Sequence, residues 1–264
     1  MNLPGTTTLL TGATGGIGHA IARKLHSTGT RLVLTGRRLD VLQPLADELG
    51  ARAIAVDLAD RASLHHLAAE CADVDVVVAN AALPASGPLT SFSEEEIDKA
   101  MEVNLNAPIV LARRLVPGML ERGRGHFVFV SSLSGKAGTP GSSIYSATKF
   151  GLRGFSQGLR GDLHDTGVGS TVVFPGFIRD AGMFAETEIE LPSYVGTSTP
   201  EQVAEAVARG IETNRAEIDV APLGMRAGAI FSSVAPQVAA TVARRIGSDK
   251  ISHELGTSQT AKRL

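Results

Sequence analysis

Tyr145 and Lys149 lie four residues apart in "IYSATKFG" (144–151), and Tyr145 is one of only two tyrosines in the chain. In a helix this spacing places both side chains on the same face. A phenol has a pKa of about 10, and a neighbouring ammonium group stabilises the phenolate and lowers that pKa. Such a tyrosine could give a proton to a carbonyl oxygen or take one from an alcohol. Ordinary surface helices also carry such pairs, so the elements around Tyr145 and Lys149 must show whether this pair is catalytic.

A pair of serines, Ser131 and Ser132, ends the strand-like run "GHFVFVSS" (125–132), shortly before the helix that we expect over residues 145–165. In open α/β sheets, ligands bind just beyond the carboxyl ends of the strands. A hydroxyl at that place could hold an oxyanion as it develops. We therefore expect the serine, the phenol and the ammonium group to converge there.

A glycine-rich loop, "TGATGGIG", follows the first strand-like run and opens the first helical run. Gly12, Gly16 and Gly18 have the spacing G-x-x-x-G-x-G, which allows a tight turn and a close approach of the backbone to a pyrophosphate. The exposed N–H groups and the dipole of the following helix favour the negative charge. An ordinary glycine-rich turn is the alternative, but the strand–turn–helix context favours a dinucleotide cofactor.

The second strand-like run ends in "LTGRRLD", which places Arg37 and Arg38 where NAD-binding proteins carry an acidic residue for the adenosine ribose. Guanidinium groups suit a 2′-phosphate because their planar forks donate two hydrogen bonds together. The sequence therefore favours NADP(H), with NAD(H) possible. The alternative is that both arginines are simply solvated at the start of a helix.

Strand-like and helical runs alternate along most of the chain, without a linker or a repeat. The strand-like runs are 6–12, 31–36, 52–58, 74–82, 125–132, 170–176 and 217–222, and the helical runs are 17–29, 39–50, 61–72, 93–120, 145–165 and 199–214. This rhythm predicts an α/β fold: a single doubly wound Rossmann-type domain over residues 1–222, with a mainly seven-stranded parallel sheet and helices on both faces.

Two segments break this rhythm. Residues 177–198 form a long loop rich in apolar side chains, which we expect to contact the substrate. Residues 223–264 form a tail that we expect to pack on the same domain, with one amphipathic helix, roughly 227–246, interrupted by Pro236. Dimerisation and contact with a membrane surface are the alternatives for this helix.

The composition of the 264 residues, with 43% hydrophobic and 20% charged, is typical of a soluble globular protein. A net charge of −2 gives no electrostatic reason to bind nucleic acid. Cys71 is the only cysteine, which excludes an internal disulfide and a cysteine-rich zinc site, and we expect no metal site. Because there is neither a signal-like start nor an apolar run long enough to span a membrane, we expect a cytoplasmic protein.

Over residues 6–222 the chain closely resembles the single-domain form of the short-chain dehydrogenase/reductase family. The resemblance rests on "TGATGGIG", on Asp57 after the third strand, on "ANAA" (79–82) with Ala82 where glycine is usual, on Asn104, on Ser132 thirteen residues before Tyr145, on Y-x-x-x-K at Tyr145 and Lys149, and on Pro175–Gly176. The family's usual spacing also makes Ser132 preferable to Ser131.

The resemblance implies an NAD(P)(H)-dependent oxidoreductase that interconverts an alcohol and a ketone or aldehyde by hydride transfer. In that family pattern, Tyr145 is the general acid/base, Lys149 lowers its pKa and holds the nicotinamide ribose, Ser132 stabilises the oxyanion, and Asn104 helps to organise a proton relay. The implied cofactor-binding residues are Gly12, Thr14, Gly16, Ile17, Gly18, Arg37, Asp57, Leu58, Asn80, Tyr145, Lys149, Pro175, Gly176 and Ile178. A protein that senses the cofactor without catalysis is the alternative.

The chain departs from the family pattern at Asp180, where a threonine near the carboxamide is common. Asp180 either changes how the loop closes or faces solvent. Four glycines at 3, 4 and 3 spacing give the Tyr145 helix a bare stripe, namely Gly151, Gly154, Gly158 and Gly161. We expect a neighbouring helix or subunit against it, in a homodimer or homotetramer. The apolar loop residues predict an uncharged, apolar carbonyl or alcohol as substrate, unless they only pack the loop onto the body.

Overall fold

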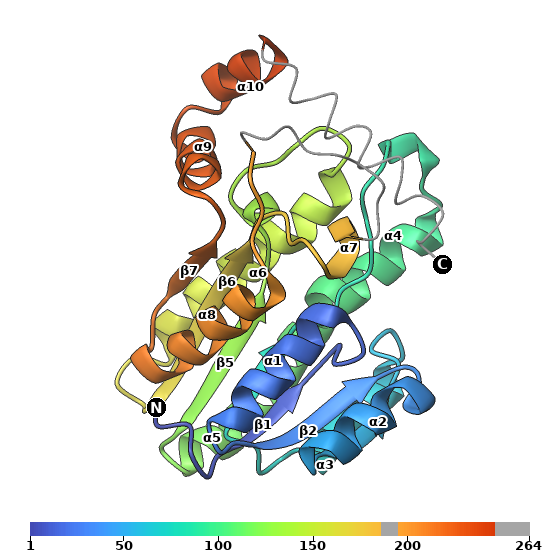
Figure 1. The fold of residues 1–264 in the computed structure, drawn as a ribbon, viewed down its shortest axis with the longest axis vertical. Coiled ribbons are helices and arrows are strands. Elements are labelled where there is room, and N and C mark those ends of the chain that lie inside the picture. The colour runs from blue at the N-terminus through green and yellow to red at the C-terminus, as the bar shows by residue number, and fades with distance from the viewer. Residues whose placement is uncertain (186–194, 246–264) are drawn as a thin grey trace.

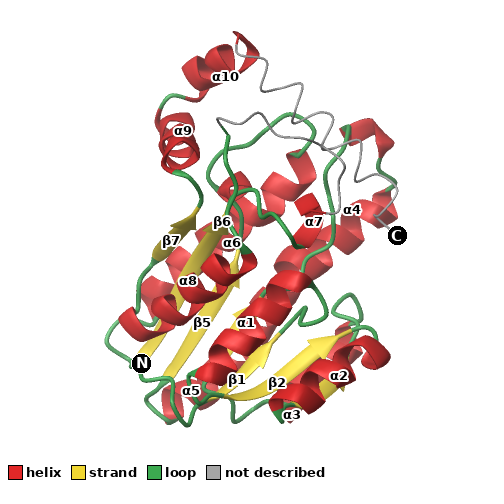
Figure 2. Cartoon of the chain, in the orientation of Figure 1, coloured by secondary structure: helices red, strands yellow, loops and turns green. Residues whose placement is uncertain are grey.

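The computed structural model describes residues 1–185 and 195–245, and within them it forms one seven-stranded parallel sheet flanked by helices (Figures 1 and 2). The strand order is β3-β2-β1-β4-β5-β6-β7. The strands are β1 (Thr7–Leu10), β2 (Arg31–Gly36), β3 (Arg52–Ala55), β4 (Val76–Ala79), β5 (Gly125–Val130), β6 (Val168–Pro175) and β7 (Glu217–Val220). The predicted doubly wound fold is therefore confirmed, and the order reverses between β1 and β4, where such sheets bind ligands.

The helices follow the predicted alternation, with additional short pieces. They are α1 (Gly16–Ser27), α2 (Leu39–Leu49), α3 (Arg61–Glu70), α4 (Glu94–Met101), α5 (Ala107–Glu121), α6 (Ser143–Asp162), α7 (Gly182–Ala185), α8 (Pro200–Thr213), α9 (Leu223–Val234) and α10 (Pro236–Arg245). Capping boxes begin α4 at Ser93 and α8 at Thr199. Each cap satisfies backbone N–H groups that have no partner within the helix.

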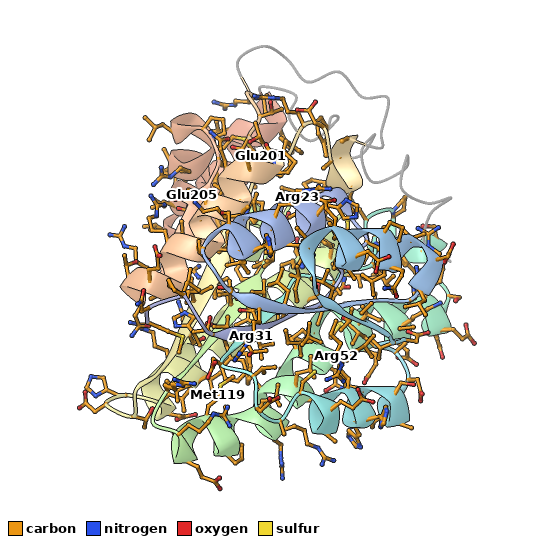
Figure 3. The ribbon with its side chains drawn as sticks, turned by 60° about the horizontal axis from the view of Figure 1, so that its bottom comes forward. Arg23, Arg31, Arg52, Met119, Glu201 and Glu205 are labelled. Atoms are coloured by element: carbon orange, nitrogen blue, oxygen red, sulfur yellow. The ribbon has the colours of Figure 1, made fainter. Side chains whose placement is uncertain are left out.

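Alternate residues of each strand point to opposite faces of the sheet, and each face has its own core. Val76 and Val78 pack with α1, α2 and α8, whereas Val77 packs with α3, α5 and α6. In Figure 3, Arg23 and Glu205 lie on α1 and α8, which run side by side, and Met119 lies on the other side of the sheet. Because both faces are covered, the strands read as nearly continuous apolar runs.

The helix expected over residues 93–120 is two helices joined by a π-helical turn, Glu102–Asn106. Pro108 lies just after this turn and has no N–H, so it cannot donate to the carbonyl of Asn104, four residues earlier. A proline inside a helical run predicts a kink at that residue, but the structure instead forms a wider turn just before Pro108. This turn carries one of the expected catalytic residues.

The tail forms two helices rather than one, because Pro236 begins α10 and the first helix starts at Leu223. Ala229 is buried against Leu133, Val172 and Phe174, while much of the remaining surface of α9 and α10 is exposed. Figure 1 shows both helices standing beyond the carboxyl ends of the strands. Residues 186–194, in the expected substrate loop, and 246–264, in the tail, lie outside the described residues.

The described residues can be searched for a membrane-spanning helix and for a metal-binding cluster. No helix in residues 1–185 and 195–245 is both long and apolar enough to cross a membrane. Within the same residues, no cluster of three or more side chains is arranged to hold a metal ion. Cys71 is buried, and burial raises the pKa of its thiol to about 11, so it stays protonated at neutral pH.

Candidate active site

A single cavity of about 1670 Å³ lies at the carboxyl ends of the strands, and it brings together almost all the predicted site residues. Its lining includes every one of the fourteen expected cofactor-binding residues, and Ser132 as well. Asn104 is the exception, because its side chain is fully buried behind the cavity wall. A cavity of this size exceeds the 300–1,000 Å³ (roughly) of ordinary ligand pockets, and leaves room for two molecules.

The glycine loop has the close contacts that its sequence predicts. Gly12 has a φ of +67°, and a Cβ atom there would lie 2.7 Å from the Cα of Ala81. A Cβ at Gly18 would collide with the carbonyl of Gly12. Both positions therefore require glycine, because any side chain would push the loop away from β4 or distort the start of α1.

Thr11 and Asn80 brace the glycine loop, although the sequence pointed only to Asn80. The Asn80 amide donates to the carbonyls of Thr11 and Gly12, at 3.1 Å each. In return, the Thr11 hydroxyl accepts from the backbone N–H groups of Asn80 and Ala81, also at 3.1 Å. The signal for Thr11 was its place directly before Gly12, where a short hydroxyl side chain can reach the neighbouring strand end.

The end of β2 presents two free cations and no acid. A Cβ at Gly36 would lie 2.7 Å from Cγ2 of Thr14, so the backbone passes directly beside the glycine loop. Arg37 and Arg38 follow, both exposed at the start of α2. In residues 1–185 and 195–245, neither guanidinium forms an ion pair with a carboxylate. The dipole of α2 does not favour cations at its amino-terminal end, so an anion bound to these arginines would offset the unfavourable interaction.

Asp57 and Leu58 border the same end of the cavity. The Oδ1 atom of Asp57 accepts the N–H of Ala59 at 3.0 Å, which fixes the carboxylate in a tight turn after β3. Leu58 is buried beside it. On the far side, Ile178 is buried and bridges to Ser198, which holds the start of the expected substrate loop against the body.

Asp180 is exposed and pairs with its neighbour Arg179, with 3.4 Å between Nε and Oδ2. Its φ of +68° puts it in a left-handed turn. The next residue, Ala181, lies over the glycine loop, because a Cβ at Gly16 would come within 2.5 Å of the Cβ of Ala181. Asp180 therefore faces solvent in this structure, while the loop that carries it closes over the glycine loop.

The two candidate serines have different roles. Ser131 is buried, and its hydroxyl donates to the backbone carbonyl of Lys149 at 3.0 Å, so it fastens β5 to α6. Ser132 lines the cavity and forms a side-chain hydrogen bond with Tyr145. It also accepts the N–H of Ser134 at 3.2 Å. The Ser131 hydroxyl is thus directed to the backbone of α6, whereas Ser132 is the serine that the family spacing favours.

Tyr145 and Lys149 share one face of α6, as their spacing predicts, with the Lys149 ammonium 5.4 Å from the centre of the Tyr145 ring. Lys149 is almost fully buried, and Nζ donates to the Val130 carbonyl at 3.0 Å. Burial lowers the pKa of Lys149 to about 8. The two residues thus meet at the end of β5, where the sheet topology was expected to bring them.

The pKa of Tyr145 differs from the expectation. We expected the lysine to lower it, but burial of the phenol raises it to about 12, and only the hydrogen bond with Ser132 opposes this effect. The physical reason is that Lys149 directs its ammonium group to the Val130 carbonyl, while the phenol itself loses solvent. The tyrosine in this structure therefore keeps its proton at neutral pH.

Asn104 lies on the π-helical turn and faces the loop after β4. Its Oδ1 accepts the N–H of Leu83 at 2.6 Å, and its Nδ2 donates to the Leu83 carbonyl at 3.0 Å. Both polar ends of the side chain are therefore occupied by backbone. The side chain positions the segment that contains Leu83, which lines the cavity.

The part of the cavity beyond Tyr145 is bordered by two apolar segments. Leu83, Pro84, Gly138 and Pro140 line it, whereas Ile144 packs away from it against Ala85 and Ala100. From the expected substrate loop, the cavity is lined by Phe177, Ile178, Met183, Phe184 and Val195. The rings of Phe177 and Phe184 lie 5.0 Å apart and form one apolar wall. The other apolar residues proposed from this loop, Ile189, Leu191 and Tyr194, lie outside the described residues.

The sequence did not assign the tail to the cavity, yet α9 and α10 contribute to its lining, including Met225, Phe231 and Val242. The amphipathic pattern of the tail was the only available signal, and it did not say what either face would meet.

The glycine stripe of α6 gives a mixed result. A Cβ at Gly151 would meet Leu105, but at Gly154, Gly158 and Gly161 it would meet open space.

Comparison with known proteins agrees with this geometry. The family model described as short chain dehydrogenase matches residues 6–191. The ketoacyl reductase HetN of Nostoc sp. is 36% identical over 83% of this chain and 79% of that protein. The NADP-dependent 3-hydroxy acid dehydrogenase YdfG of Salmonella typhi is 36% identical over 75% of this chain and 86% of that protein. A solved short-chain dehydrogenase from Sphingobium yanoikuyae in complex with NADPH superposes with a TM-score of 0.75 at 27% identity, covering 81% and 87% of the two chains. The chain belongs to the short-chain dehydrogenase/reductase family, and it is an oxidoreductase of the kind that acts on CH–OH and carbonyl groups.

Proposed function

We propose that this enzyme reduces a bulky, uncharged ketone or aldehyde with NADPH, and that Tyr145 supplies the proton. The observation that carries the proposal is the placement of Ser132, Tyr145 and Lys149 in the same cavity as the glycine loop and Arg37. This arrangement puts a proton donor and an oxyanion partner beside a dinucleotide site.

The residues present fit an NADP(H) molecule. The contacts at Gly12 and Gly18 leave no room for side chains, which is the condition for a pyrophosphate to approach the backbone. Arg37 and Arg38 would hold the 2′-phosphate, since they have no carboxylate partner in the described residues and no acid replaces them at the end of β2. The bound nicotinamide would supply or accept the hydride. NAD(H) would lack the phosphate for these arginines, which supports a preference for NADP(H).

The protonation states of Tyr145 and Lys149 support reduction as the favoured direction near pH 7. A phenol with a pKa of about 12 carries the proton that a carbonyl oxygen needs as it gains charge. Ser132 would hold that oxygen beside the phenol. Lys149, with a pKa of about 8, is mostly charged at neutral pH. Once the transfer leaves a phenolate, its ammonium group would turn from the Val130 carbonyl towards that charge.

Resupply of the proton would pass behind Lys149, along the expected relay. The Asn104 side chain is committed to Leu83, but its carbonyl cannot receive the usual helical hydrogen bond from Pro108, which has no N–H. That carbonyl would be left as an acceptor for a water molecule. We infer that Asn104 both positions the Leu83 loop and offers this acceptor.

The substrate proposal rests on the apolar wall of Phe177, Phe184 and Leu83. Two cations of the cavity lining, Lys136 and Arg153, are already paired with Glu217 and so offer little to a carboxylate. The relatives' names suggest a ketoacyl group and a 3-hydroxy acid, which differ in charge. Assays with a 3-oxo acid and with its ethyl ester, matched in chain length, distinguish a charged substrate from an uncharged one. The proposal predicts a higher kcat/KM for the ester, and a clear preference for the acid would contradict it.

We also propose that residues 1–222 form the catalytic domain, that the tail belongs to the same unit, and that the chain is a homodimer or homotetramer whose interface includes α6. The open space at Gly158 supports this, because glycine costs a free helix about 1 kcal/mol relative to alanine. In a monomer, Gly158→Ala would raise the free energy of unfolding by about that amount. If α6 packs on a partner, Gly158→Ala instead weakens the oligomer, which light scattering would detect.

A single assay separates catalysis from cofactor sensing on the same fold. Purified protein is mixed with NADPH and a panel of carbonyl compounds, and the loss of NADPH absorbance is followed. The proposal predicts turnover with at least one bulky ketone. Tight NADPH binding without turnover across the panel would favour the sensor.

A further inference from the structure

The α9–α10 segment, which we call the arm (residues 223–245), concentrates the exposed apolar surface of the molecule. Ten large hydrophobic side chains are exposed in the described residues, and six of them lie in the arm: Leu223, Ile230, Phe231, Val234, Val238 and Val242. Leu223 and Val234 are 78% and 80% exposed. Scattered exposed apolar residues are normal, but a concentration of this kind marks an interaction surface.

These side chains form one stripe rather than a ring. On α9, Leu223, Ile230, Phe231 and Val234 follow the spacing i, i+7, i+8 and i+11, which lies on one side of a helix. On α10, Val238 and Val242 are one turn apart. We call these six side chains the arm face.

The opposite side of α9 holds the arm to the body. Ala229 is buried against Phe174 and Leu133, and the Ser233 hydroxyl donates to the Lys136 carbonyl at 2.7 Å. Arg226 lies 3.8 Å from Asp219 of β7. With this side anchored, Leu223, Ile230, Val234 and Val238 of the arm face point away from the core, whereas Phe231 and Val242 also line the cavity. Figure 1 shows α9 and α10 standing clear of the sheet and of α8.

The charges of the arm are all of one sign. The chain has 27 acidic residues, but residues 221–245 contain none, and they contain three arginines. Arg244 and Arg245 occupy the last turn of α10, where the helical spacing places Arg245 beside Val238 and Val242, and Arg244 on the side that lines the cavity. An apolar stripe flanked by cations alone, on helices too short to span a bilayer, is the pattern of a helix that lies in the lipid interface.

We propose that the arm face docks on the surface of an anionic lipid bilayer. The valine, isoleucine, leucine and phenylalanine side chains would enter the headgroup boundary, and Arg245 would meet lipid phosphates. A second copy of the chain is the other occupant to test. It would have to bring acidic groups to Arg245, and the arm itself, which would meet its own copy in a two-fold contact, has none.

Docking would also place the active-site cavity at the lipid. Phe231 and Val242 belong to the arm face, yet they line the same cavity as Tyr145. An apolar substrate dissolved in the bilayer would then reach the cavity without crossing water. This consequence rests on the proposed function, whereas docking itself does not, and vesicle binding can be measured without turnover.

The chain contains no tryptophan, so a single one introduced into the arm face reports on its surroundings. Phe231→Trp is added to vesicles of phosphatidylcholine alone, or of equal parts phosphatidylcholine and phosphatidylserine. The proposal predicts a blue shift and quenching by brominated lipid only with the anionic vesicles. Leu89→Trp, at an exposed residue of the body, is the control and should not respond. An unchanged Phe231→Trp spectrum would overturn the proposal.

A second experiment disrupts the apolar stripe and measures how much of the full chain sediments with anionic vesicles. The double variant Ile230→Glu/Val234→Glu should bind the vesicles about tenfold more weakly or worse. Each substitution replaces an aliphatic side chain that would be buried in the lipid with a charged one. Leu89→Glu is the matched control, because Leu89 is 59% exposed and Ile230 57%. Circular dichroism and turnover of a water-soluble ketone check that the variants are folded. If wild-type protein ignores vesicles and the double variant changes the oligomeric state, the arm face binds a second copy and the proposal is wrong.

Discussion

The side-chain amide of Asn104 forms two hydrogen bonds with the backbone of Leu83. Its Oδ1 accepts the Leu83 N–H at 2.6 Å, and its Nδ2 donates to the Leu83 carbonyl at 3.0 Å. The two residues are 21 positions apart, and the contact joins the π-helical turn to the loop after β4. Because Leu83 lines the cavity, a residue outside the cavity wall sets the shape of the substrate side.

Replacing Asn104 should therefore affect stability and substrate binding together. Asn104→Ala leaves the N–H and the carbonyl of Leu83 without their partner, and each unsatisfied buried group costs about 1–3 kcal/mol. Asn104→Asp keeps the acceptor for the N–H but places a carboxylate oxygen against the carbonyl. We expect both variants to lower the melting temperature and raise KM for the ketone. Asn106→Ala, on the same turn, is the control, and an Asn104→Ala protein with unchanged stability would contradict this role.

Arg37 should set the choice of cofactor. Its loss removes charge-assisted hydrogen bonds worth about 1.5–3 kcal/mol in total, so Arg37→Ala should raise KM for NADPH by about 10- to 150-fold. KM for NADH should hardly change, since NADH has no 2′-phosphate. Arg209→Ala, at an exposed arginine of α8, controls for the loss of a surface cation. An equal effect on both cofactors would show that Arg37 does not read the phosphate.

His126 should make the fold sensitive to acid. It is buried in β5, 2.8 Å from the Thr171 hydroxyl, and burial lowers its pKa to about 3, helped by the N-terminal ammonium and Arg160. Between that value and the ordinary 6.5, the unfolded chain binds a proton that the folded chain does not. The free energy of unfolding therefore falls as pH drops from 6.5 towards 3, by at most about 1.4 kcal/mol per pH unit from this residue.

Urea unfolding at several pH values measures this slope. His126→Gln keeps a polar partner for Thr171 but cannot titrate, so its stability should fall less steeply in acid than that of the wild type. His164→Gln removes an exposed histidine instead and should keep the wild-type slope. Parallel curves for the wild type and His126→Gln would mean that the histidine is not held neutral.

The sequence was informative wherever a local pattern and the sheet topology acted together. The glycine spacing, the arginines after β2 and the pair Tyr145–Lys149 each follow an element whose end must lie at the carboxyl edge of a parallel sheet. Their convergence needed no knowledge of side-chain packing. Strand lengths were less certain: residues 80–82 were read as strand, but Asn80 leaves the ladder because its amide binds the carbonyls of the glycine loop.

Other features depend on contacts between distant residues, which a sequence pattern does not contain. Pro108 signalled a break, but the π-helical turn forms where Asn104 can reach Leu83. The pKa of Tyr145 depends on how much solvent the fold removes and on where Lys149 directs its ammonium, and both went against the expectation. The tail was recognised as amphipathic, yet only the structure shows which side is anchored and which is exposed.

The central claim is that Tyr145 gives its proton to the substrate in a reaction that uses NADPH. Tyr145→Phe removes one hydroxyl and leaves the ring and Lys149 in place, so the comparison with wild type isolates the proton. The decisive measurement is kcat for a bulky ketone together with the dissociation constant for NADPH. The account predicts a fall in kcat of about 10²- to 10⁴-fold with NADPH binding unchanged. Turnover retained in Tyr145→Phe would contradict it.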